Sequence, residues 1–180
     1  ITKEDYFSQS GIKSSALIGL PYEPLFPYFK GHENAFRILD GSSFIEDGSG
    51  TGIVHMSPGF GEDDQRVCAE NDISVVVPVD EKGRYTDEVF DLDDLSLQGL
   101  NVVAQADDKA SDEPFTDEQL AKYGLVNLRI IQWLKANDML VKQDDYNHNY
   151  PHCWRTDTPL IYRAMPSWYV AVTEFRDEAV

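Results

Sequence analysis

Short apolar stretches alternate with glycine, proline and acidic residues along most of this chain, a pattern typical of proteins built from brief strands. The run 47–50, Asp-Gly-Ser-Gly, predicts a hairpin turn, and the run 81–84, Glu-Lys-Gly-Arg, predicts a second turn. Between such turns, the apolar stretches predict strands at 36–39, 43–46, 51–56, 75–77, 139–146, 160–164 and 168–172.

Three segments have a helical pattern instead. One helix is predicted to begin at Glu62, because acidic residues follow it and suit the positive end of a helix dipole. The run 116–119, Thr-Asp-Glu-Gln, matches a capping box and predicts a second, short helix. Asn127 is predicted to cap a third helix, whose apolar face holds Leu128, Ile131 and Leu134.

Many short strands with a few intervening helices indicate an α+β fold with a barrel-like β core and peripheral helices. The 180 residues are enough for one domain with its own core, so residues 1–180 are predicted to form a single domain. An apolar fraction of 42% with 12% aromatic residues fits a globular protein and excludes a disordered one.

The charge is strongly negative and unevenly distributed. The formal net charge of −17 argues against a general nucleic-acid-binding surface, which is normally basic. Residues 80–118 contain thirteen acidic and three basic residues, a net charge of −10 in one region. We interpret this region as a solvated flank that faces away from any nucleic acid.

Cysteine usage and hydropathy predict the compartment. Cys68 and Cys153 are too few for a disulfide scaffold and are expected to be free thiols in the reducing cytoplasm. No apolar run approaches the roughly 20 residues that span a bilayer, and the first residues lack the pattern of a secretory signal. The sequence therefore predicts a cytoplasmic protein with no membrane partner.

The most informative stretch is 50–64, Gly-Thr-Gly-Ile-Val-His-Met-Ser-Pro-Gly-Phe-Gly-Glu-Asp-Asp. An apolar strand is predicted to run into His55, a turn rich in glycine and proline follows, and acidic residues open the next helix. The end of a strand and the start of a helix then meet at one concave corner. Such a corner can hold a small polar ligand between an imidazole and the carboxylate of Asp64.

This stretch resembles the signature of the editing domain of class I isoleucyl-tRNA synthetases, the connective-polypeptide insertion that hydrolyses wrongly charged tRNA. The valine-type domain usually has lysine at the position of His55 and the leucine type has methionine, so the histidine favours the isoleucine type. The block 22–28, Tyr-Glu-Pro-Leu-Phe-Pro-Tyr, is similar to a further family block. The block 150–155, Tyr-Pro-His-Cys-Trp-Arg, with 158–160 and 167–169, resembles the segment that returns to the synthetase core.

The resemblance implies roles for the residues of this corner. It makes Asp64 the anchor of the substrate's α-ammonium group, through charge-assisted hydrogen bonds worth about 1.5–3 kcal/mol each. The alternative is that Asp64 only complements the helix dipole. It makes His55 a wall that excludes the larger, correct amino acid, with general base as the alternative role. The catalytic residues are then Asp64 and His55, and the substrate-binding residues are Gly52, His55, Ser57, Pro58, Gly59, Phe60 and Asp64.

The implied activity is hydrolytic editing, the deacylation of valyl-tRNA(Ile) and of valyl-adenylate. Isoleucine and valine differ by one methylene, which lets a synthetic site discriminate between them by only about 1–3 kcal/mol. Isoleucyl-tRNA synthetase is the standard example of this limit. A second, smaller site that admits valine is therefore needed. Water would attack the ester carbonyl without a covalent enzyme intermediate. The implied partners are the tRNA(Ile) 3′ end carrying valine and the rest of the synthetase in cis. Editing needs no cofactor, and ATP serves the parent synthetase. The alternative is a non-catalytic module that binds the aminoacylated 3′ end.

One family feature is missing from the sequence. Family members carry Trp-Thr-Thr-Thr-Pro-Trp upstream, whereas only Thr2 precedes Thr51 here and the chain does not begin with methionine. We therefore expect a module excised from a longer synthetase, without the threonine-rich segment that helps to line the pocket. Hydrolysis is expected from the parent protein rather than from the isolated module.

Two other clusters invite interpretation. His148, His152 and Cys153 lack a Cys-x-x-Cys pair, so no metal site is predicted. The side chains of Trp154 and of the pair 168–169, Trp-Tyr, are predicted to be buried by packing, with stacking on a tRNA end as the alternative.

Overall fold

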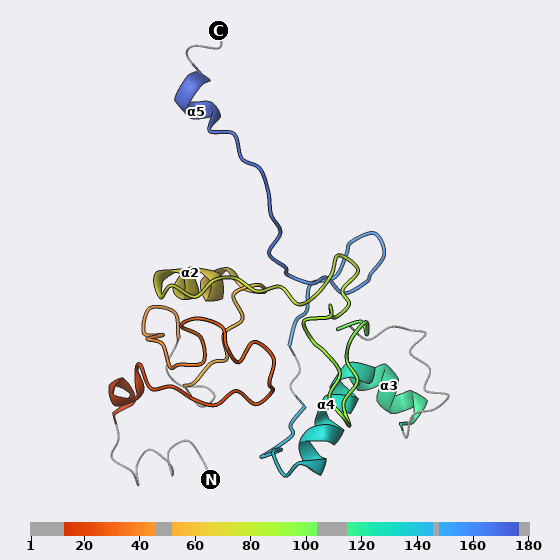
Figure 1. The fold of residues 1–180 in the computed structure, drawn as a ribbon. Helices are drawn as coiled ribbons and strands as arrows, with labels where there is room; N and C mark the ends of the chain where they lie inside the picture. The colour runs from red at the N-terminus through yellow and green to blue at the C-terminus, as the bar shows by residue number, and fades with distance from the viewer. Residues whose placement is uncertain (1–12, 46–51, 104–114, 146–147, 177–180) are drawn as a thin grey trace.

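The structure, a computed structural model, describes residues 13–45, 52–103, 115–145 and 148–176 (Figure 1). The predicted hairpin turn at 47–50 lies outside these ranges. The helices of the described residues are the 3₁₀ turn η1 (Ser14–Leu17), α2 (Glu62–Glu70), α3 (Asp117–Tyr123), α4 (Leu125–Ala136) and α5 (Val172–Phe175). None of the helices in this part of the chain has the length and apolar character needed to cross a membrane.

Antiparallel pairing within the described ranges consists of isolated bridges rather than continuous ladders. The predicted strand 36–39 does pair with residues 19–22, since the Tyr22 N–H donates to Phe36 O and the Ile38 N–H to Leu20 O. The mixed content of helix and β pairing is therefore confirmed, and the barrel stays a prediction. The bridges join Pro21 to Arg37, Val79 to Tyr85, Arg84 to Asn101, Leu92 to Leu95, and His152 to Pro159.

Several predicted strands are wrong as regular elements. Residues 52–56, 75–77, 139–145, 160–164 and 168–171 form no ladder, and α5 begins at Val172, where a strand was expected. Apolar side chains alone do not make these segments into strands, because a strand also needs a neighbour whose backbone groups lie in register with its own. Val75, in one of these segments, is exposed.

The turn predicted at 81–84 is confirmed as the tip of a small hairpin. The Asp80 N–H donates to Arg84 O at 2.8 Å, and the Asp80 carboxylate accepts the N–H groups of Lys82 and Arg84 at 2.8 and 2.9 Å. Gly83 has a positive φ of 76°, a conformation that costs glycine little. Two signals in the sequence, an aspartate before the turn and a glycine inside it, thus fix the local backbone.

The helix starts follow the predicted chemistry in two cases out of three. α2 begins at Glu62 as expected, and Thr116 and Gln119 form the expected capping box of α3. The predicted cap at Asn127 is wrong: α4 begins at Leu125, directly after Gly124, which has a φ of 75° and also ends α3. Asn127 lies inside α4, and its side-chain amide donates to Tyr123 O at 2.8 Å. A glycine that turns the chain between two helices therefore outweighs a favourable capping residue further on.

The main core lies between α4 and the loops of residues 85–100, against which the segment 26–28 packs. Phe26 contacts Trp133 of α4 with ring centroids 5.2 Å apart, and Tyr28 contacts Phe90 at 5.1 Å. We call this region the α4 core. Its fully buried members are Val89, Leu95, Leu97 and Val126.

The last part of the chain contrasts with this core. Residues 165–176, here called the C-terminal arm, extend away from the other helices and carry α5 at their far end (Figure 1). Trp168 and Tyr169 of the arm are exposed, and so is Trp154. The prediction that these three aromatic residues are buried is therefore wrong, because no described segment covers them.

Candidate functional site

The stretch 57–61 forms a tight turn that leads into α2. The Phe60 N–H donates to Ser57 O at 2.9 Å, and Gln65 N–H of α2 donates to Gly61 O at 2.9 Å. Gly59 is buried, and a Cβ atom at this position would collide with the carbonyl oxygen of Val76. Glycine is therefore required there so that the turn can rest directly on the backbone of residues 76–77.

Asp64 points back from the first turn of α2 to this loop. Its Oδ2 accepts the backbone N–H of Ser57 at 2.9 Å, and the residue is half-buried. A carboxylate offers about four acceptor positions on its two oxygens, so one backbone N–H leaves capacity for a ligand's donors. The contact fixes the carboxylate at the corner that the sequence predicted, where a strand end was expected to meet a helix start.

The space around Asp64 is restricted by α2 and by the turn before it. Burial, and to a smaller extent the charge of Asp64, raises the pKa of the Cys68 thiol one turn further along α2. A Cβ atom added at Gly61 would lie 3.1 Å from Oδ2 of Asp64. A side chain at position 61 would therefore press on this carboxylate and shift it by a few tenths of an ångström.

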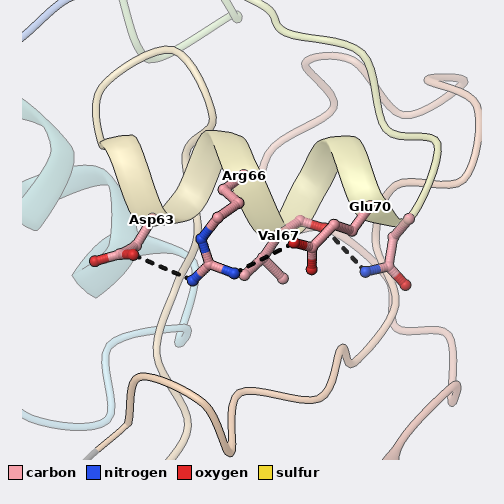
Figure 2. Close-up of polar contacts among 5 residues, drawn as sticks. Asp63, Arg66, Val67 and Glu70 are labelled. Carbon is pink, nitrogen blue, oxygen red and sulfur yellow. Dashed lines mark hydrogen bonds and ion pairs between the residues drawn. The ribbon is translucent and has the colours of Figure 1, made fainter.

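The three acids that open α2 have different environments. Asp63 pairs with Arg66 at 3.2 Å, and Arg66 also contacts Glu70 at 3.3 Å along one exposed side of the helix, as Figure 2 shows. Glu62 lines a hollow described below. Asp64 alone of the three is bonded to the turn before the helix. Asp64 therefore differs from its two neighbours by its contact with the turn, and its role as a ligand anchor or as a complement to the helix dipole stays a prediction.

His55 lies near the same corner. It is exposed, as are Ile53 and Val54 before it. Ser57 is two positions after His55, which limits the distance between their Cα atoms to about 7 Å, and the Ser57 N–H contacts Asp64. The backbone at His55 and the carboxylate of Asp64 are therefore neighbours, although the apolar strand expected before His55 is not formed.

A hollow of about 300 Å³ lies between the start of α2 and residues 162–164. A second hollow of about 390 Å³ adjoins it and shares Gln65, Tyr162 and Ala164. The first is large enough for a small ligand. The described residues that line it are Pro58, Gly59, Gly61, Glu62, Gln65, Tyr162 and Ala164.

Two of the predicted substrate-binding residues, Pro58 and Gly59, line this hollow. The other predicted residues lie beside it in the turn or in the chain leading to it, and are not among its lining residues. Gly52 is exposed with a φ of 74°, and Phe60 is half-buried. The residues outside the lining are Gly52, His55, Ser57, Phe60 and Asp64.

Sequence reasoning missed one wall of the hollow. The Ala164 N–H donates to Gly59 O at 2.7 Å, and Arg163 Nε donates to Val79 O at 2.8 Å, so the segment 161–165 is held against the turn. Tyr162 and Ala164 are two residues apart, as expected for an extended segment that presents alternate side chains to one side. That alternation is visible in the sequence, but the turn against which the segment 161–165 lies is about a hundred residues away.

The histidines and cysteine near residue 150 have local partners. The His152 Nδ1 hydrogen bonds to Tyr150 O at 2.8 Å, and Cys153 is half-buried. Throughout the described ranges, the side chains of His, Cys, Asp and Glu form no group of three that could hold a metal ion.

No family model matches the chain. Isoleucine–tRNA ligases of Rickettsia bellii (strain OSU 85-389) and Rickettsia felis (strain ATCC VR-1525 / URRWXCal2) are each 50% identical to it over 169 residues. The isoleucine–tRNA ligase of Rickettsia prowazekii (strain Madrid E) is 48% identical over the same length. Each match covers 94% of this chain and 13% of the relative.

These relatives belong to the class of the aminoacyl-tRNA synthetases. Within that class the chain is similar to a segment of isoleucine–tRNA ligase, which confirms the resemblance predicted from stretch 50–64 and the blocks at 22–28 and 150–155. The chain spans only 13% of the length of these curated relatives.

Proposed function

We propose that this chain is an editing module of isoleucyl-tRNA synthetase that hydrolyses valine from valyl-tRNA(Ile) and from valyl-adenylate. The observation that carries the proposal is the contact between Asp64 and the Ser57 N–H, which fixes a carboxylate against the turn whose residues 58, 59 and 61 line the hollow. An α-ammonium group is the feature shared by both substrates, and a fixed carboxylate is its natural partner. The other proposed partner is the rest of the synthetase, in cis.

The proposed chemistry needs no cofactor, and ATP belongs to the synthetic reaction of the parent enzyme. Asp64 orients the aminoacyl group by its ammonium, and the polar groups of the turn hydrogen bond to the charge that develops when water attacks the acyl carbonyl. Valine leaves as the free acid, with the ribose hydroxyl of tRNA or AMP as the other product. The family resemblance assigns His55 the role of a wall that limits the size of the side chain admitted, and in this structure His55 lies outside the lining of the hollow. Its replacement by alanine should let the parent enzyme deacylate isoleucyl-tRNA(Ile) as well.

The decisive experiment compares two neighbouring substitutions in a complete isoleucyl-tRNA synthetase that contains this segment. In Asp64→Asn the amide oxygen still accepts the Ser57 N–H, but the negative charge is lost. Loss of a charge-assisted hydrogen bond of about 1.5–3 kcal/mol predicts roughly a tenfold to 150-fold slower deacylation of valyl-tRNA(Ile), with aminoacylation unchanged. Asp63→Asn is the matched control, because its carboxylate pairs with Arg66 on the exposed side of α2.

Equal deacylation by both variants and the wild type would remove Asp64 from the mechanism. A second candidate function is favoured by the fact that Asp64 and His55 do not line the hollow: a module that holds the aminoacylated 3′ end without hydrolysing it. Titration with a non-hydrolysable valyl-adenosine analogue separates the two. Binding of the analogue combined with no deacylation in the complete enzyme would favour the second candidate.

A further inference from the structure

The segment 161–165, which forms one wall of the hollow of about 300 Å³, has two kinds of position. Tyr162 and Ala164 line this hollow, whereas Ile161 and Arg163 are not among its lining residues. The two pairs alternate along the chain, as expected for the two sides of an extended segment. Ile161 and Arg163 are therefore placed to attach the wall to the rest of the protein.

Both of these side chains contact the hairpin whose tip is the turn 81–84. A Cβ atom at Gly83 would lie 2.9 Å from Cδ1 of Ile161, so the isoleucine packs directly on this glycine. Arg163 Nε donates to Val79 O at 2.8 Å. Gly83 and Val79 are both buried within this chain, so the two contacts do not depend on what surrounds it.

The hydrogen bond from Arg163 satisfies a carbonyl group that water hardly reaches. Val79 is 3% exposed, and a buried carbonyl without a donor is unfavourable. The guanidinium donor is charged, so its hydrogen bond is stronger than a bond between two neutral groups. The side chain of Arg163 therefore ties the wall to the hairpin.

The residue after Arg163 ties the same wall to the turn 57–61. The Ala164 N–H donates to Gly59 O at 2.7 Å, and Gly59 is buried. These adjacent residues thus hold the wall between the hairpin on one side and the turn on the other. Without the bond from Arg163, the wall would tilt about the bond from Ala164, and Tyr162 would move relative to the turn.

We propose that Arg163 is a positioning residue that holds Tyr162 at a fixed distance from the turn and so sets the width of the hollow. It acts through its hydrogen bond to Val79 O rather than through contact with a ligand. The consequence for valyl-tRNA(Ile) rests on the proposed function. A displacement of about 1 Å slows a reaction in a site by about 100-fold, because the reacting groups must be held in a productive geometry.

The test separates the hydrogen bond of Arg163 from its charge, in a complete isoleucyl-tRNA synthetase that contains this segment. Glutamine carries its amide nitrogen at the position of Nε, so Arg163→Gln keeps a donor for Val79 O without the charge. Arg163→Met has a similar length and no donor. Arg163→Met should lower kcat for deacylation of valyl-tRNA(Ile) by about tenfold to 100-fold with little change in KM. Arg163→Gln should retain most of the activity, and aminoacylation should be unchanged in both variants.

Amide hydrogen exchange of the same enzymes reports on the wall without any reaction. In Arg163→Met the Ala164 amide should exchange faster than in the wild type, because a wall that tilts opens the bond to Gly59 O more often. In Arg163→Gln the exchange should stay close to that of the wild type. Arg66→Met is the matched control and should alter neither exchange nor deacylation, because this guanidinium pairs with acids of its own helix.

Exchange at Ala164 that is the same in Arg163→Met and in the wild type would overturn the proposal. Equal loss of deacylation in Arg163→Met and Arg163→Gln would overturn it as well, because the charge of Arg163 would then act directly on the substrate. Undiminished deacylation by Arg163→Met would show that the wall does not set the reacting geometry. A wild-type enzyme that does not deacylate valyl-tRNA(Ile) would contradict only the proposed function, and the exchange measurement would still decide the role of Arg163.

Discussion

The α4 core and the C-terminal arm use the same kinds of side chain in opposite ways. In the α4 core, apolar and aromatic residues from the segment 26–28, the loops of 85–100 and α4 cover one another. In the arm, Trp168, Tyr169 and Val170 are exposed although the segment is equally apolar. The comparison teaches that burial in this chain is decided by which segments have a neighbour, because an apolar side chain gains stability only when something removes it from water.

The largest expected effect comes from deleting a buried side chain of the α4 core. Leu97 is 2% exposed, so Leu97→Ala should lower the free energy of unfolding by about 2–5 kcal/mol through lost burial and a residual cavity. Val170→Ala in the exposed arm should change it by less than about 0.5 kcal/mol. Urea denaturation followed by circular dichroism measures both. A comparable loss in the two variants would mean that the arm is packed in solution.

The hydroxyl of Tyr28 allows the α4 core and the C-terminal arm to be compared by removing a single oxygen atom. Among the described residues its hydroxyl is buried without a hydrogen-bond partner, and an unmade buried hydrogen bond costs about 1–3 kcal/mol. Tyr28→Phe should therefore raise the free energy of unfolding by about 1–2 kcal/mol. Tyr169→Phe, on the exposed arm, is the control and should leave it unchanged. Destabilisation by Tyr28→Phe would reveal a partner for this hydroxyl.

The same tyrosine predicts how stability depends on alkaline pH. Burial, with smaller contributions from the charges of Asp91 and Tyr85, raises the pKa of Tyr28 above 10.0, and burial also raises the pKa of Tyr85. The unfolded chain then loses these protons first, so stability is complete below about pH 10 and falls as pH rises toward the folded-state pKa values. Denaturation at about pH 8 and about pH 11 should show this fall, and Tyr28→Phe should reduce it. A fall of the same size in both proteins would exclude Tyr28 as a contributor.

The smallest of these effects concerns the helix that packs beside α4. Thr116 and Gln119 cap α3 reciprocally, with the Gln119 N–H 3.2 Å from Thr116 Oγ1 and the Thr116 N–H 3.0 Å from Gln119 Oε1. Thr116→Ala should lower the free energy of unfolding by about 1 kcal/mol. Thr173→Ala in α5, at the end of the arm, should have no measurable effect on the same denaturation curve. Equal effects would show that α5 contributes as much to stability as α3.

Local chemistry made part of this structure predictable. The capping box at 116–119, the turn at 81–84 and the acidic start of α2 depend on residues within a few positions of one another, and all three are confirmed. Strand pairing depends on distant partners, so apolar runs such as 75–77 were assigned to ladders that they do not form. The cap at Asn127 failed for a different reason, because Gly124 already supplies the turn between α3 and α4.

The candidate site was predictable to a similar extent. Stretch 50–64 predicted a turn before the helix at Glu62, and the turn is present. The contact from the Ser57 N–H to Asp64 was not predicted. The wall formed by Tyr162 and Ala164 was missed, because the bond from the Ala164 N–H to Gly59 O joins residues that nothing in the sequence pattern connects. The exposure of Trp154 was also missed, since an indole is more often covered than displayed.

The close approach of Gly59 to the carbonyl of Val76 has a consequence for how this protein can vary. The turn 57–61, which lines the hollow, rests on residues 76–77, and these two residues lie outside its lining. A bulkier or shorter side chain at 76 or 77 would therefore tilt the turn. Substitutions that change the shape of the hollow are therefore expected at residues 76–77 as well as among the residues that line it.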